Sequence, residues 1–348
     1  MQNKDRNMDL STINLIFQTT EKTTSYWGES FAQLQNYRIL KTVISSLSIF
    51  GSLAIILTYF LFQDLQTTSR KFLVCISIGD FFTVLPYLIK TWTVNSHMNC
   101  VAQSFVSTTA VMWSFFWTSS LAIYLYLVIV KKNQGLADKL MPYFHVINWG
   151  FPLTLVAASW NKLGQGYAHD SGGWCWIDLI KMKKDEAIVW MLACGKFWEI
   201  LSYFVDVILC FIVTRKLNAE VKERQNINIS SESTQATIQG KRKLIWAPLL
   251  FVFLRIWGTI RFLLFCFKSH QGQGDLSETL IVCHIIGDSS QGFVYFILFC
   301  LLTRKFRENI CGAWCRFRKV KIEGRPDSLK SHKHRYLLEN QKNIVFYT

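Results

Sequence analysis

Several charged side chains lie inside long apolar segments of the sequence, together with closely spaced tryptophans. Lys196 and Glu199 are three residues apart, so on a helix they share a face and can form an ion pair. Trp113 and Trp117 are four apart and would share a face too. Charges inside a bilayer are costly and usually face the interior of a helix bundle. These features favour a pocket with aromatic walls and cationic groups, suited to an anionic ligand; its candidate residues are Lys90, Trp113, Trp117, Lys196, Glu199 and Arg261.

A purely structural role for the same charges stays open. They could form internal ion pairs, or reach the membrane surface along their aliphatic stems, without touching a ligand. Asp80 and Arg255 are further charges within apolar segments. Asp206 and Asp288 are weaker candidates for polar contacts between helices.

Metal and pigment chemistry have little support in the sequence. A metal-dependent membrane hydrolase needs clustered His and carboxylate side chains in its interior. Only His145 and His284 lie in apolar segments, far apart and with no second His at ligand spacing. A retinal protein would need a Lys in the last apolar segment, and residues 278–302 contain none. We therefore expect no enzymatic activity, no metal and no cofactor.

The elements that must position these residues are membrane-spanning helices. Of the 348 residues, 51% are hydrophobic and 18% are charged, whereas a soluble protein has about 25% charged residues. Only helices and closed barrels satisfy every backbone polar group in lipid, and a spanning helix needs about 20 apolar residues. Seven segments are long enough for helices and too long for barrel strands: 39–62, 71–94, 100–130, 140–160, 187–213, 243–267 and 278–302. The expected fold is an all-α bundle of seven transmembrane helices.

The distribution of basic residues sets the orientation of this bundle. With the amino terminus outside, the inner segments contain 24 Lys and Arg residues and the outer segments contain nine. Because basic residues concentrate on the cytoplasmic side of membrane proteins, residues 1–38 form a short extracellular tail and the carboxyl terminus lies inside. The net charge of +15 is therefore loop charge and does not indicate nucleic-acid binding. We expect residues 161–186 to form the long outer loop and the polar residues 214–242 to form a flexible inner loop.

Two pairs of cysteines are expected on opposite sides of the membrane. Cys100 and Cys175 both lie on the oxidising outer side, so we expect a disulfide between them in preference to two free thiols. Cys311 and Cys315 lie in residues 303–318, whose apolar spacing predicts an amphipathic helix at the membrane interface. There they are candidates for lipidation by membrane-anchoring acyl chains, with ordinary reduced thiols as the alternative. Residues 319–348 would form a cytoplasmic tail.

Particular motifs within these segments resemble known receptors. The third segment reads SFFWTSSLAIYLYLVIV, the fourth contains WGFP, the sixth begins KLIWAPLL and the seventh contains QGFVYFILFC, and all four are similar to secretin-type receptors. The second segment, SIGDFFTVLPY, looks instead like the cyclic-AMP receptors of slime moulds. This mixture, together with GKFWEIL in the fifth segment, resembles an orphan group of G-protein-coupled receptors. The resemblance covers approximately residues 39–307.

The resemblance implies a receptor that activates a heterotrimeric G protein of the Gq type, with phospholipase C and calcium downstream, and a location in the plasma membrane or primary cilium. The outer 38 residues contain no cysteine, unlike the large disulfide-bonded domain of secretin-type receptors, so the unknown ligand would be recognised mainly by the helical bundle and the outer loop. Pro248 would be a hinge in the sixth helix, or else a static kink. The basic residues expected to face the G protein are Lys131, Lys132, Lys241, Arg242 and Lys243. A transporter or channel without G-protein coupling is the alternative function.

Overall fold

The computed structural model describes residues 10–63, 66–92, 97–164, 175–177, 182–226, 232–267, 275–303 and 306–307. The chain divides into two units, residues 1–297 and residues 298–348. Nearly all of the first unit that the structure describes is helical. Its helices are α1 (Leu10–Leu61), α2 (Thr68–Trp92), α3 (His97–Leu125), α4 (Gln134–Lys139), α5 (Met141–Ala158), α6 (Lys184–Met191), α7 (Phe197–Asn226), α8 (Glu232–Phe267) and α9 (Asp275–Phe296).

Short irregular elements join or extend these helices. π-Helical turns follow α3 (Tyr126–Val130), join α6 to α7 (Leu192–Lys196) and follow α9 (Ile297–Leu301). A 3₁₀ turn, Trp160–Lys162, leads from α5 into a two-residue strand β1 (Leu163–Gly164). This strand pairs antiparallel with β2 (Trp176–Ile177) in the expected outer loop.

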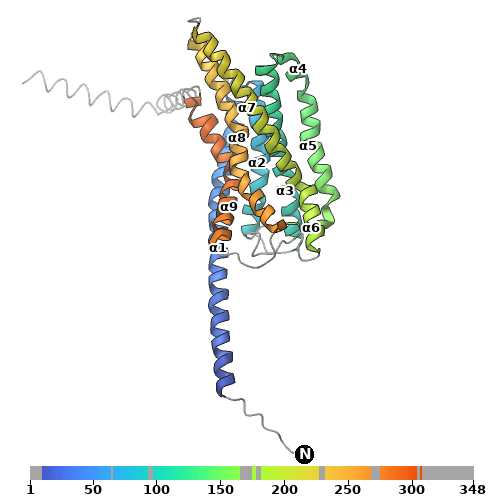
Figure 1. Ribbon diagram of the computed structural model, residues 1–348, viewed down its shortest axis with the longest axis vertical. Coiled ribbons are helices and arrows are strands. Elements are labelled where there is room, and N and C mark those ends of the chain that lie inside the picture. Colours follow the sequence, from blue (N-terminus) through green and yellow to red (C-terminus); the bar gives the residue numbers. More distant parts are fainter. Residues whose placement is uncertain are drawn as a thin grey trace, which may run out of the picture. The chain divides into compact units, whose positions relative to one another are not determined.

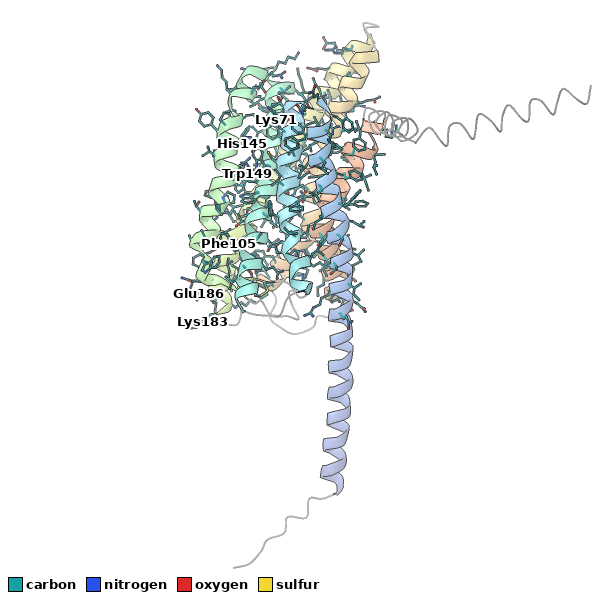
Figure 2. The ribbon with its side chains drawn as sticks, turned by 180° about the vertical axis from the view of Figure 1, so that it is seen from behind. Lys71, Phe105, His145, Trp149, Lys183 and Glu186 are labelled. Atoms are coloured by element: carbon teal, nitrogen blue, oxygen red, sulfur yellow. A yellow bond between two sulfur atoms is a disulfide. The ribbon has the colours of Figure 1, made fainter. Side chains whose placement is uncertain are left out.

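The long helices of the first unit lie side by side and form the seven-transmembrane bundle (Figure 1). Lys183 and Glu186 lie at one end of the bundle and Lys71 lies at the other, as expected for outer and inner segments (Figure 2). Six helical segments are long and apolar enough to cross a membrane: Gln35–Leu61, Thr68–Leu88, Cys100–Val130, Lys184–Arg224, Ile238–Phe267 and Glu278–Leu301. The remaining helix, α5, has 18 residues and includes His145, Asn148 and two prolines, which lower its hydropathy.

Helices extend beyond the predicted spans in two segments. The inner loop 214–242 was predicted to be flexible, but α7 continues to Asn226 and α8 begins at Glu232. The prediction was wrong because this polar stretch also contains many Glu, Lys, Arg and Gln residues, which are good helix formers. The first helix also begins at Leu10, far before the start of the predicted span, in a stretch without proline.

Small residues allow the helices to approach closely at the seams between them. A Cβ atom on Gly51 of α1 would lie 2.6 Å from the carbonyl oxygen of Gly292 in α9. The backbone N–H of Gly292 donates a hydrogen bond to Ser48 Oγ in α1, at 3.1 Å. Gly79 of α2 packs in the same way against the backbone of Ser114 in α3. Close approach through small residues is how helices associate in lipid, where apolar surface alone gives little driving force.

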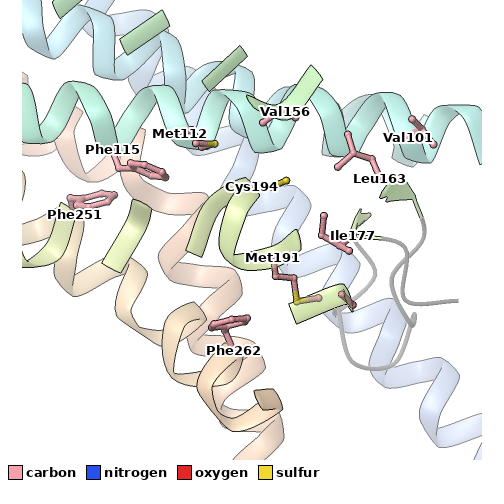
Figure 3. Packing of buried hydrophobic residues seen from close by; sticks show 11 residues of the cluster. Val101, Met112, Phe115, Val156, Leu163, Ile177, Met191, Cys194, Phe251 and Phe262 are labelled. Atoms are coloured by element: carbon pink, nitrogen blue, oxygen red, sulfur yellow. The ribbon is translucent and has the colours of Figure 1, made fainter. Parts of the chain in front are cut away.

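A buried apolar cluster holds α3 against the helices that carry the candidate site. Met112 and Phe115 of α3, Cys194 of the π-helical turn and Phe251 of α8 belong to it (Figure 3). Ile177 of β2 also belongs to the cluster and is fully buried, so the outer loop packs onto the bundle. The opposite faces of the helices carry exposed apolar side chains, as lipid contact requires; examples are Phe60, Val146, Phe204 and Phe253.

Candidate functional site

A buried ion pair on α7 is the first part of a polar network inside the bundle. Lys196 Nζ donates a hydrogen bond to Glu199 Oε2 at 2.6 Å, and the two side chains are only 10% and 4% exposed. The Tyr203 hydroxyl donates to the other carboxylate oxygen, Glu199 Oε1, at 2.7 Å. The same hydroxyl lies 3.2 Å from Thr259 Oγ1 and so links α7 to α8. Both oxygens of Glu199 therefore have a donor.

The π-helical turn between α6 and α7 helps to place Lys196 in the interior. Lys196 is the last residue of this turn, and Gly195 within it departs from helical geometry. The indole N–H of Trp198 donates to the Ala193 carbonyl at 3.0 Å, which satisfies a backbone acceptor in the turn. A π-helical turn inserts an extra residue into the helix and changes the direction of the side chains that follow. Such turns are frequent at functional sites.

The second part of the network joins α8 to α9. Arg261 Nη1 lies 2.9 Å from His284 Nδ1, and His284 Nε2 lies 3.0 Å from Asp288 Oδ2. Arg255 Nη1 approaches the same Asp288 oxygen at 3.7 Å. Arg255 Nε donates to Gln291 Oε1 at 3.3 Å. These contacts form a continuous row of polar side chains along the seam between the two helices.

Glycines make this seam narrow enough for the row to form. A Cβ atom on Gly258 of α8 would lie 2.5 Å from His284 Nε2. A Cβ atom on Gly287 of α9 would clash with the backbone of Leu254 in α8. Any larger side chain at either position would push α8 and α9 apart and separate the polar groups between them.

The row continues into α3 and α2. Gln291 Nε2 donates to Ser114 Oγ at 2.9 Å, and Ser114 Oγ donates to Asp80 Oδ1 at 2.7 Å. The polar network therefore includes side chains of α2, α3, α7, α8 and α9. We define it as Asp80, Ser114, Lys196, Glu199, Tyr203, Arg255, Thr259, Arg261, His284, Asp288 and Gln291.

The two candidate tryptophans lie outside this network. Trp117 packs against His145 and Trp149 of α5, and its ring centroid lies 4.7 and 5.6 Å from theirs. The Trp113 indole N–H donates to the Trp149 carbonyl at 3.0 Å, and its ring meets Phe82 of α2. Trp113 and Trp117 share one face of α3, as their spacing predicts, and this face is turned toward α5. Their contacts therefore hold α5, and through Phe82 also α2, against α3. Of the candidate pocket residues, Lys196 and Glu199 contact each other, and Arg261 contacts His284 in the second part of the network.

Sequence reasoning missed several members of the network. Tyr203, Thr259, Gln291 and Ser114 were not singled out, because uncharged polar residues are common in transmembrane helices. Asp288 was named as a candidate for polar contacts between helices, and its contact with His284 could have been found because the two residues are four apart and so share a helix face. The side chain of Lys90, all of Cys311 and Cys315, and most of the predicted interfacial helix 303–318 lie outside the described residues.

A disulfide ties the outer loop to the start of α3. Cys100 and Cys175 are bonded, with their Cα atoms 5.5 Å apart, and both are buried. Cys175 directly precedes β2, whose pairing with β1 fixes the loop across the outer end of the bundle. Lys162 Nζ also donates to Glu186 Oε1 at 2.8 Å, joining the two ends of the loop. The outer loop is therefore held by three separate attachments.

Pro248 lies buried in α8, inward of the polar network. Proline has no N–H, so the Leu244 carbonyl loses its helical partner. Side chains from other helices bond the neighbouring carbonyls: Cys210 Sγ donates to Ile245 O at 3.7 Å, and the Tyr295 hydroxyl donates to Ala247 O at 2.9 Å. These two hydrogen bonds hold α8 near Pro248 to α7 and α9. Movement of α8 would have to break or exchange them.

The basic residues predicted to face a G protein lie at the inner ends of α3 and α8. Lys132 follows the π-helical turn and has a positive φ of 53°, and its Nζ lies 3.5 Å from Glu220 Oε1 of α7. Arg242 Nη2 donates to Asn218 Oδ1 of α7 at 3.1 Å. The inward extension of α7 thus contacts the inner ends of both neighbours. The other basic residues of this inner face are Lys131, Lys241 and Lys243.

The sequence of the chain is similar to known families and proteins. The sequence pattern of the family described as "7 transmembrane receptor (Secretin family)" matches residues 34–295. G-protein coupled receptor 157 of Mus musculus is 34% identical over 280 residues, which cover 78% of this chain and 83% of that protein. The Homo sapiens protein of the same name is 34% identical over 274 residues, or 76% and 80% of the two chains. Cyclic AMP receptor-like protein A of Dictyostelium discoideum is 28% identical over 181 residues, or 50% and 47%.

Proposed function

We propose that this chain, which belongs to the secretin family of seven-transmembrane G-protein-coupled receptors, transmits a signal from an extracellular ligand to a heterotrimeric G protein. The polar network is the observation that carries the proposal. It joins five helices in the interior of the bundle. A ligand that exchanges contacts with this network would shift the balance between two arrangements of the helices.

The moving element in this mechanism is the inner part of α8. Arg255 and Thr259 connect α8 to the network, and Pro248 lies seven residues inward of Arg255. A change in the network would therefore act on a helix that already lacks one backbone hydrogen bond. Movement of the inner end away from α7 would separate Arg242 from Asn218 and open a cleft lined by the basic inner face.

The remaining features of the proposal follow from orientation and resemblance. The amino terminus lies outside the plasma membrane, and residues 303–318 lie in the lipid interface with Cys311 and Cys315 as acylation sites. The G protein is of the Gq type, with phospholipase C and calcium downstream, and the receptor is present in the membrane of the primary cilium. The mammalian relatives are named as G-protein coupled receptors, which supports coupling to a G protein in general.

The proposal is tested by expressing the full chain with a panel of G-protein activation sensors, without added ligand. We expect activation of at least one class, Gq first, in proportion to the amount of receptor at the cell surface. Replacing Lys241 and Arg242 by Gln should reduce this response, because both lie on the inner face. The matched control replaces the exposed outer residues Arg38 and Lys183 by Gln and should leave the response unchanged.

A flat response across the whole panel at normal surface level would contradict G-protein coupling. Reconstituted vesicles would then be used to measure ion and solute flux. Flux through the chain would establish the transporter or channel alternative.

A further inference from the structure

An incomplete ion pair lies at the centre of the polar network. Arg255 is 2% exposed, and its guanidinium stays charged at any physiological pH. Its Nη1 atom is 3.7 Å from Asp288 Oδ2, and its Nε atom donates to Gln291. Within the described part of the chain, neither Arg255 Nη2 nor Asp288 Oδ1 has a hydrogen-bond partner, although both atoms are buried. A donor and an acceptor of opposite charge are thus left unsatisfied beside each other.

The pair cannot satisfy itself in this arrangement. A bidentate guanidinium–carboxylate contact would bring two nitrogens within about 2.9 Å of the two oxygens. Here Arg255 Nη1 is 3.7 Å from Asp288 Oδ2, and His284 Nε2 lies 3.0 Å from the same oxygen. Buried polar atoms without partners are unusual and need an explanation, such as a bound group that completes them.

Part of the Asp288 side chain other than its buried Oδ1 atom is accessible. Its side chain is 31% exposed even though it contacts α8. The lipid-facing side of α9 is marked by Ile286, which is 41% exposed. Two residues correspond to about 200° around an α-helix, so Asp288 points away from lipid. Its exposed area therefore lies on the side of α9 that faces away from lipid.

The charges of the network balance, which argues against a ligand of a single sign. Lys196, Arg255 and Arg261 are cationic, whereas Asp80, Glu199 and Asp288 are acidic. A simple anion at Arg255 would lie beside the Asp288 carboxylate, and a simple cation at Asp288 would lie beside the guanidinium. Either arrangement adds a repulsive contact in a setting where charges interact strongly. The observed arrangement does not favour the anionic ligand expected from the sequence.

We propose that this site binds a small zwitterion of the amino-acid type. Its carboxylate accepts hydrogen bonds from Arg255 Nη2, and its ammonium donates to Asp288 Oδ1. The inference rests on the proposed receptor function and names the class of ligand for it. Arg261 and His284 lie closer to the outer ends of α8 and α9, so a ligand entering from outside passes them before it reaches the pair.

Ligand-dependent thermal unfolding of the purified full chain in lipid nanodiscs tests this site. The probes are the standard L-amino acids together with β-alanine and γ-aminobutyrate, compared with acetate and methylammonium. At least one zwitterion should raise the unfolding temperature by about 5 °C at saturation. Acetate and methylammonium, each carrying one charge, should have no comparable effect.

Variants separate the proposed site from other binding. The neutral double variant Arg255→Gln/Asp288→Asn leaves no unpaired charge and should abolish the shift. Arg255→Lys keeps the charge but removes the planar fork, so the half-saturating concentration should rise about tenfold. Arg215→Gln, on the exposed surface of α7, is the matched control and should retain the shift.

Three results would overturn the inference: no zwitterion stabilises the chain, acetate stabilises it equally well, or the shift survives in the double variant. A pair completed only by water would give the first of these. The measurement needs no G protein, so its outcome is independent of coupling. Amino-acid binding without G-protein coupling would support this site and refute the proposed receptor function. G-protein coupling without amino-acid binding would support the receptor function and refute this site.

Discussion

Breaking the Lys196–Glu199 pair tests whether the buried charges act as a unit. The pair is 2.6 Å long with both side chains nearly buried, so removing one partner leaves the other charge uncompensated. Such a loss costs about 3–5 kcal/mol. Because each kcal/mol shifts the unfolding temperature of a large domain by about 2–4 °C, either single variant should unfold about 10 °C lower.

The informative variants are Lys196→Met, Glu199→Gln and their combination, measured by thermal unfolding of purified protein. Glu199→Gln keeps an oxygen that can accept from Tyr203 at the position where the carboxylate now does, so its effect reports mainly the charge. The double variant has no charge at either of these two positions and should recover most of the loss. Lys183→Met, an exposed residue on the outer side, should unfold like the unmodified protein.

Additive losses in the double variant would refute this reasoning, because independent effects have no coupling energy. Signalling then separates structure from ligand contact. Exchanging the two charges, Lys196→Glu with Glu199→Lys, should restore expression if the pair only supports the fold. Signalling that stays normal in both single variants and in the exchange would remove the pair from the candidate ligand site.

The remaining predictions concern the outer loop, the proline and the inner face. Cys100→Ser and Cys175→Ser should reduce surface expression equally. The double variant should be no worse, because either change removes the same bond. Additive losses in surface labelling would contradict this prediction. Pro248→Ala should restore the missing N–H and lower G-protein activation at equal surface level, and a parallel loss of expression and activity would instead indicate a packing role. Glu220→Gln should change the free energy of unfolding by less than about 1 kcal/mol in a denaturant titration, because Lys132 is 70% exposed; a larger loss would show that this contact is stronger than an ordinary surface pair.

The sequence was sufficient to predict the fold class because lipid imposes a simple requirement on each spanning segment. Seven apolar blocks of adequate length gave an all-α seven-helix bundle, and even α5, with His145 and Asn148, was found by its length. The helical extensions of α7 and α8 were missed, because a polar segment rich in helix formers resembles a flexible loop in composition.

The candidate site was only partly predictable. Contacts within one helix follow from spacing, so Lys196 and Glu199 could be paired from three-residue separation alone. Contacts between helices depend on how each helix is rotated, and a single sequence does not contain that information. The rotation of α3 turns Trp117 toward α5 and away from the network. The contact between Arg255 and Asp288 likewise depends on how α8 and α9 are rotated.

The most direct test of the proposed mechanism is a distance measurement between the inner ends of α3 and α8. Spin labels would be attached to cysteines introduced at Lys131 and Lys241, and the full chain would be studied in lipid nanodiscs. If the receptor couples through α8, adding a nucleotide-free heterotrimeric G protein should lengthen this distance, and adding a GTP analogue should reverse the change. A distance that stays the same with every class of G protein would contradict the account.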